Sequence, residues 1–135
     1  FVMCLPGTTL IETPDGERPI SELDAGDSLR GGSVVVIKNA YTPEETVFVK
    51  LVLADGRWVE TCDVHSIAGR PAMTYAQGDA LSESHIVEKQ VTIRRERTYD
   101  LLTSSSDGGY TVKGIPVATM IPTLHRLAAL LGKVV

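Results

Sequence analysis

The chain of 135 residues is 43% hydrophobic and carries a net charge of −4, from 17 acidic and 13 basic side chains. This length suits one domain with its own core and is too short for two ordinary domains. No basic run exceeds Arg94-Arg95 and no stretch approaches the ~20 apolar residues of a membrane span, which argues against nucleic-acid binding and a transmembrane protein.

Short β-strands separated by turns dominate the predicted secondary structure. The strand candidates are 8–12, 18–20, 33–37, 46–54, 57–61, 86–93, 98–103 and 110–117. Asp55-Gly56 is a strong hairpin signal between two of them, and 20–29 is predicted to be a broken turn of helix. Because strands do not alternate with long helices, the pattern predicts an all-β fold with non-local pairing.

The C-terminal residues follow a different pattern. Leu124, Leu127 and Leu131 fall on one face of a helix over 122–131, and Gly132 supplies a stop signal after them. We therefore expect a short C-terminal helix, with 120–135 as a downstream flank or appended element.

Cys4 and Cys62 are the only cysteines of the chain. Two cysteines do not make a disulfide framework, although one bridge between them is allowed. This usage favours a reducing, cytoplasmic compartment. Cys4 precedes the first predicted strand, where it is a small buried hydrophobe, half of a disulfide, a metal ligand or a nucleophile.

The segment "TCDVHSI" contains the second candidate, His65. This histidine is either structural, held by a backbone carbonyl, or a proton donor and acceptor that a neighbour orients. The candidates for the orienting neighbour are Thr61, Cys62 and Asp63. A third interpretation is a tetrahedral zinc site. Its ligands would be Cys4, Cys62, His65 and either His85 or His125.

Four segments, in this order, resemble the Hint (hedgehog/intein) family of self-processing domains. "CLPGTTLIETPDGERPISELDAGDSL" is similar to the family's N-terminal motif, and "LADGRWVETCDVHSI" to its second motif, a hairpin that runs into a histidine. "MTYAQGDALSESHIVEKQ" and "YDLLTSSSDGGYTVKGIPV" resemble the segments that follow. Each segment alone is a weak match, and four in the right order are a strong one.

The resemblance implies a compact, horseshoe-like all-β fold in which both chain ends meet at one site. The self-processing domain would span 4–119, and 1–3 would be an upstream flank. Cys4 and His65 would then be neighbours. The implied partners are the domain's own flanking sequences in cis, with no cofactor or metal, and we expect a monomer.

The implied reaction is an N-to-S acyl shift. The Cys4 thiol attacks the Met3 carbonyl, and the Met3–Cys4 amide becomes a thioester that water, a thiol or an amine then cleaves. His65 would protonate the leaving nitrogen. The residues that would fix the ring or the carbonyl are Thr61, Cys62 and Asp63.

Two departures from the family pattern leave alternatives open. The family usually has threonine three residues before the histidine, whereas here Cys62 holds that place and Thr61 lies one residue earlier. On a strand these two side chains point to opposite faces. Splicing members end in His-Asn, whose asparagine cyclises to cut the downstream bond, but this chain has Ala118 and Thr119 there.

Three functions are therefore open at this point. The domain processes only its N-terminal side, or it is a splicing intein whose terminal asparagine is replaced by Ala118, with Thr119 as downstream nucleophile. The third is a degenerate Hint module with a structural role. The sequence also raises a redox hypothesis: if Cys4 and Cys62 have Cα atoms within about 7 Å, a disulfide would switch the nucleophile off.

Overall fold

The computed structural model describes residues 4–122 of the chain. Apart from Pro122, the expected C-terminal helix lies outside these residues. Within the described range, no helix has the length and apolar character needed to cross a membrane.

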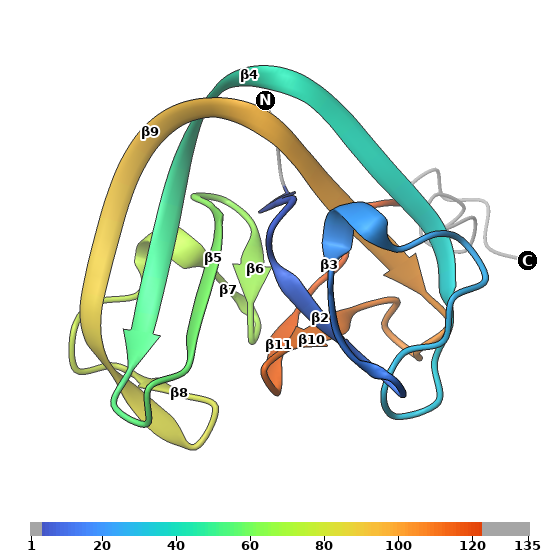
Figure 1. Cartoon of the computed structure of the whole chain (residues 1–135). Helices are drawn as coiled ribbons and strands as arrows, with labels where there is room; N and C mark the ends of the chain where they lie inside the picture. The colour runs from blue at the N-terminus through green and yellow to red at the C-terminus, as the bar shows by residue number, and fades with distance from the viewer. Residues whose placement is uncertain (1–3, 123–135) are drawn as a thin grey trace, which may run out of the picture.

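Two long antiparallel strands, β4 (Val35–Leu53) and β9 (Ser84–Thr103), form the frame of the molecule. They pair along their length and bend together into an arch over the smaller elements (Figure 1). The sheet continues with β5 (Trp58–Cys62) beside β4 and with β1 (Leu5–Pro6) beside β9. This all-β arch confirms the horseshoe-like fold expected from the sequence.

Each long strand replaces two shorter ones that the sequence predicts. In β4 the pairing with β9 continues through "NAYTPEET", and the register shifts between Tyr41 and Glu44, where Pro43 lies. Proline has no N–H to donate, so the ladder slips at this point. Pairing with β9 thus keeps turn-forming residues extended, an effect that local sequence does not reveal.

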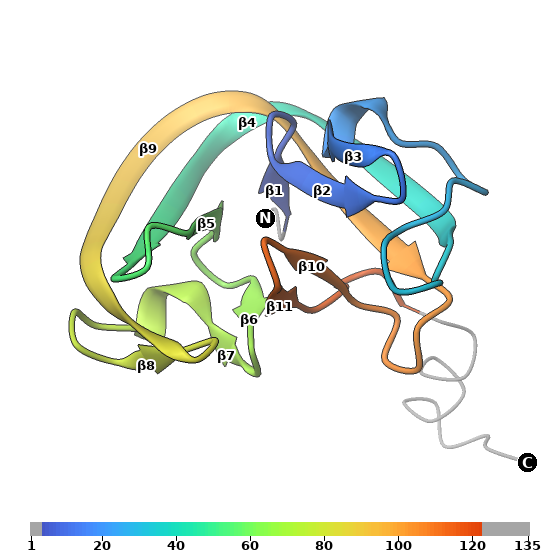
Figure 2. The same ribbon diagram turned by 60° about the horizontal axis from the view of Figure 1, so that its bottom comes forward.

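Smaller elements lie inside the arch (Figure 2). A tight turn at Asp15-Gly16 joins β2 (Leu10–Thr13) to β3 (Gly16–Pro19), and the two strands pair. A four-stranded sheet consists, in spatial order, of β10 (Tyr110–Val112), β11 (Ile115–Val117), β6 (Ser66–Ile67) and β7 (Arg70–Pro71). The remaining elements are β8 (Ala80–Leu81), which pairs with β9, and two short 3₁₀ turns, η1 (Ile20–Glu22) and η2 (Ala72–Thr74).

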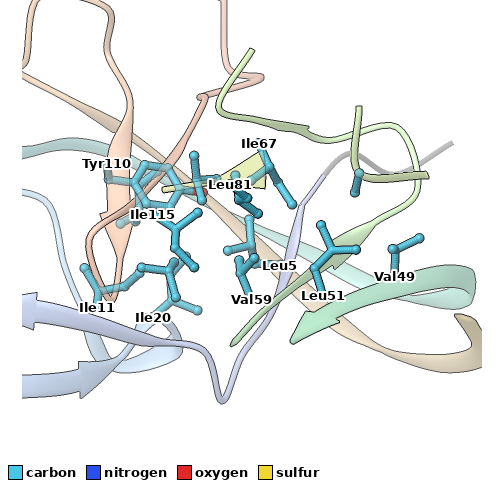
Figure 3. Packing of buried hydrophobic residues seen from close by; sticks show 14 of the residues in the cluster. Leu5, Ile11, Ile20, Val49, Leu51, Val59, Ile67, Leu81, Tyr110 and Ile115 are labelled. Carbon is cyan, nitrogen blue, oxygen red and sulfur yellow. The ribbon is translucent and has the colours of Figure 1, made fainter. Parts of the chain in front are cut away.

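Buried side chains from these sheets meet in one hydrophobic core (Figure 3). Leu5 brings β1 into this core, and Gly7 allows β1 to lie close to β9. A Cβ at Gly7 would lie 2.7 Å from Cε1 of Tyr99, so a larger residue would require the Tyr99 ring to move. The core therefore fixes the position of Cys4, the residue just before β1.

Candidate functional site

Cys4 and Cys62 are in direct contact. The Cys62 N–H donates to the Cys4 carbonyl at 3.0 Å, and the Cys4 N–H donates to the Cys62 Sγ at 3.2 Å. Both residues are fully buried and both thiols are free. Cys62 therefore contacts the nitrogen that Cys4 contributes to its peptide bond with Met3.

Thr61 and Asp63, the neighbours of Cys62 in sequence, make hydrogen bonds with backbone carbonyl groups. Thr61 pairs with the core residue Val49, and its Oγ1 donates to the Cys62 carbonyl at 2.8 Å. The N–H of Asp63 donates to the Val47 carbonyl at 3.0 Å. These bonds fix the end of β5 and the turn that leads to His65.

His65 is fully buried, and its Nε2 lies 2.7 Å from the carbonyl oxygen of Ala118. A carbonyl oxygen only accepts hydrogen bonds, so Nε2 carries a proton in this contact. The other ring nitrogen, Nδ1, is buried and has no hydrogen-bond partner within the described part of the chain. Nδ1 is thus the one ring nitrogen of His65 that the described residues leave without a partner.

Asp100, on β9, is a buried carboxylate that the sequence motifs did not single out. Leu5 pairs with Tyr99, and continuing that register by one residue places Cys4 opposite Asp100. Asp100 Oδ1 accepts a hydrogen bond from the Tyr110 hydroxyl at 2.6 Å.

Burial is the largest cause of the pKa shifts of Cys4 and Asp100. For the Cys4 thiol, burial raises the pKa to about 12. A hydrogen bond from Thr98 opposes this rise, and the charges of Cys62 and Asp100 add to it. Burial also raises the pKa of Asp100, against the opposing charge of His65. The Cys4 thiol is therefore protonated at neutral pH, and Asp100 is a stronger base than an ordinary carboxylate.

The downstream end of the domain is held at the same place. Besides the contact between His65 and the Ala118 carbonyl, the N–H of Met120 donates to Asp100 Oδ2 at 2.8 Å. Thr119 is buried, and its Oγ1 accepts a hydrogen bond from the N–H of Ile121 at 3.1 Å. His65 and Asp100 thus each bind one backbone atom of the Ala118–Met120 segment.

The geometry does not support the zinc interpretation. Among residues 4–122, no three His, Cys, Asp or Glu side chains are grouped to hold a metal ion. His85 pairs with Ala80 at the opposite end of β9 from Asp100. The other proposed ligand, His125, lies outside the described residues.

No family model matches the sequence, and no curated protein matches it. Solved structures match the fold. The gp41-1 intein is similar with a TM-score of 0.69 and 18% sequence identity, covering 88% of this chain and 100% of its own. The chain has the Hint fold of inteins.

Two further structures share this Hint fold. A bacterial intein-like domain from Clostridium thermocellum has a TM-score of 0.68 and 20% identity, covering 88% of this chain and 99% of its own. A DnaB intein from Synechocystis has a TM-score of 0.69 and 15% identity, covering 89% of this chain and all of its own. At such identities the likeness establishes the architecture, and the chemistry depends on the residues of this chain.

Proposed function

We propose that this Hint domain processes its own precursor by an N-to-S acyl shift at Cys4. One observation carries the proposal: a single buried cluster contacts both ends of the domain. Cys62 contacts the Cys4 nitrogen, while His65 and Asp100 bind the Ala118–Met120 segment. A domain that acts on its own flanks needs this arrangement, because the bonds to be processed lie at the two ends.

In the proposed reaction the Cys4 thiol gives up its proton and its sulfur attacks the Met3 carbonyl carbon. A carbon–sulfur bond forms, the carbon–nitrogen bond breaks, and the Cys4 nitrogen leaves as an amine. Asp100 lies opposite Cys4 with a raised pKa, which suits it to accept the thiol proton. The nitrogen needs a proton to leave: His65 Nδ1, which has no other partner, takes up the proton that Asp100 accepted from the thiol and passes it to the nitrogen.

Cys62 and Thr61 act as positioning residues in this scheme. The Cys62 sulfur holds the N–H of the scissile bond, and the Thr61 hydroxyl holds the Cys62 carbonyl. Asp63 supports the turn between Cys62 and His65 through its backbone. The thioester would then pass to water, a small thiol or an amine, and no step requires a cofactor.

A splicing intein with a replaced asparagine is the second candidate. The contact between His65 Nε2 and the Ala118 carbonyl favours it. An asparagine at 118 would attack its own carbonyl carbon, and a donor on the carbonyl oxygen stabilises the charge that develops there. Thr119, the next residue, would then be the downstream nucleophile.

A reporter protein fused upstream of Phe1 tests the main proposal. Dithiothreitol should release the reporter from the wild-type fusion, and Cys4→Ala should abolish the release because the thioester no longer forms. Thiol-induced release that persists in Cys4→Ala would overturn the mechanism. A folded wild-type fusion that releases nothing would overturn it too, and would favour a degenerate structural module.

A further inference from the structure

We propose that Cys4 and Cys62 form a reversible disulfide that switches the nucleophile off. Formation of the bond depends only on the geometry of the two thiols. Its consequence for processing rests on the proposed function of Cys4.

The backbone brings the two residues to disulfide distance. The hydrogen bond from the Cys62 N–H to the Cys4 carbonyl joins their main chains at 3.0 Å. With standard bond lengths, this single contact keeps the two Cα atoms within about 7 Å, the limit beyond which a disulfide cannot form without backbone movement. The Cys62 side chain also points toward Cys4, because its Sγ accepts the Cys4 N–H at 3.2 Å.

A thiol is not needed at 62 to hold the scissile nitrogen. The oxygen of serine or threonine accepts an N–H donor at least as well as sulfur does. What cysteine adds at this position is the ability to be oxidised, and it stands beside the only other cysteine of the chain. Both thiols are free in the structure, which therefore corresponds to the reduced form.

Hydrogen peroxide is a suitable oxidant, because it is small and accepts the two electrons that two thiols lose when they form a disulfide. One thiol reacts with hydrogen peroxide to give a sulfenic acid and water, and the second thiol displaces the hydroxyl as a second water. Two thiols thereby lose two electrons and two protons, and one peroxide becomes two waters. A reductant reverses the net change by supplying two electrons and two protons.

The disulfide would block the first step of processing. A disulfide sulfur has no thiolate to attack the Met3 carbonyl, so the Met3–Cys4 amide stays intact until the bond is reduced. Burial raises the pKa of both thiols, which slows oxidation of the folded protein and makes the oxidation step the slow one. The precursor would then be stored in oxidising surroundings and released for processing in reducing ones.

The test uses the full chain with its upstream reporter, treated with hydrogen peroxide and then digested under non-reducing conditions. We expect a mass loss of two hydrogens and a joined pair of tryptic peptides that contain Cys4 and Cys62. The phosphine TCEP should separate them; a phosphine is chosen because a thiol would itself cleave a thioester. Cys62→Ser is the matched control and should never give the joined peptides.

A second route covers the case in which burial keeps peroxide out. The chain is unfolded in denaturant and refolded in a glutathione redox buffer, so that the pair closes as the fold forms. Thiols that stay unlinked by both routes would overturn the inference, whether or not the reporter is released. Hydroxylamine should release the reporter about tenfold or more faster from the TCEP-treated fusion than from the oxidised one. A joined pair with equal release would overturn the switch.

Discussion

The two ends of this Hint domain meet at one buried cluster, but they differ in chemistry. At the upstream end, Cys4 is the proposed nucleophile, and the Cys62 Sγ accepts a hydrogen bond from the Cys4 backbone N–H. At the downstream end, His65 binds the Ala118 carbonyl and Asp100 binds the Met120 N–H, but neither Ala118 nor Thr119 has a side-chain amide. At the downstream end, His65 and Asp100 bind the backbone on either side of Thr119. A side-chain amide that could cut this segment by cyclisation is absent from Ala118 and Thr119.

This difference indicates which residues serve both ends and which serve one. In the proposed mechanism His65 and Asp100 act at both ends, so their loss should affect processing wherever it occurs. Cys4 and Cys62 belong to the upstream end, and Ala118 belongs to the downstream end. Substitutions at these positions therefore separate a one-sided self-processing domain from a splicing intein with a replaced residue.

Loss of His65 should have the largest effect among the shared residues. His65→Ala removes the group proposed to protonate the leaving nitrogen, and we expect thiol-induced release of an upstream reporter to slow by about 10²–10⁴-fold. The matched control is His85→Ala, which removes a histidine remote from the site. Circular dichroism should show both variants folded, and a folded His65→Ala with the wild-type rate would make this histidine merely structural.

Asp100→Asn should have the next largest effect, because it removes the proposed base while keeping the size of the side chain. We expect release to slow by about 10²-fold. Tyr110→Phe is the matched control: it removes one hydrogen bond to Asp100 but keeps the carboxylate, and should slow release less. If the two variants lose activity equally, the carboxylate serves only to hold Tyr110 and the Ala118–Met120 segment.

Ala118→Asn is expected to change the downstream end alone. Ala118 lines a cavity of about 370 Å³, which offers room for a longer side chain. If a native asparagine has been replaced here, the variant should cut the bond before Thr119 and ligate the flanks through the Thr119 hydroxyl, as mass spectrometry would show. Thr119→Asn is the companion variant and would move any cut to the bond before Met120. If neither Ala118→Asn nor Thr119→Asn gives a downstream cut, the splicing alternative is rejected and a domain that processes only its N-terminal side remains.

The smallest expected effect is on stability at high pH. The pKa of Cys4 is about 12 in the folded chain against an ordinary 9.0, so the folded state keeps its proton longer. The stability this contributes is fully present below pH 9 and is lost as the pH rises towards 12, by up to about 1.4 kcal/mol per pH unit. Denaturant unfolding of wild type and Cys4→Ala across this range should show the steeper decline in wild type. Parallel declines would mean that the thiol is not desolvated as described.

Local sequence patterns predicted the all-β class, and they singled out Cys4 and His65, whose catalytic roles stay predictions. Cys4 and His65 stand in recognisable motifs, and the Asp55-Gly56 and Asp15-Gly16 turns lie where the chain reverses. The continuity of β4 was not predictable, because the residues around Pro43 favour a turn and are extended only by pairing with β9.

Asp100 was missed for a related reason. Its proposed role rests on the register between β1 and β9 and on its hydrogen bonds with Tyr110 and Met120, which come from other parts of the chain. The signal that was available is a carboxylate within the apolar run "YDLL", since burying a charge is costly unless something binds it. The choice between Thr61 and Cys62 likewise needed the pairing of β5 with β4, which sets the face that each side chain occupies.

The proposed thioester between Met3 and Cys4 is tested most directly by identifying the bond that hydroxylamine cleaves. An upstream reporter fusion is treated with hydroxylamine, and the released piece is identified by intact-mass analysis. The account predicts a reporter that ends in Phe1-Val2-Met3 with a hydroxamate on Met3, because hydroxylamine traps the thioester at Cys4, and no such product from Cys4→Ala. Release at any other bond, or an identical hydroxamate from Cys4→Ala, would contradict it.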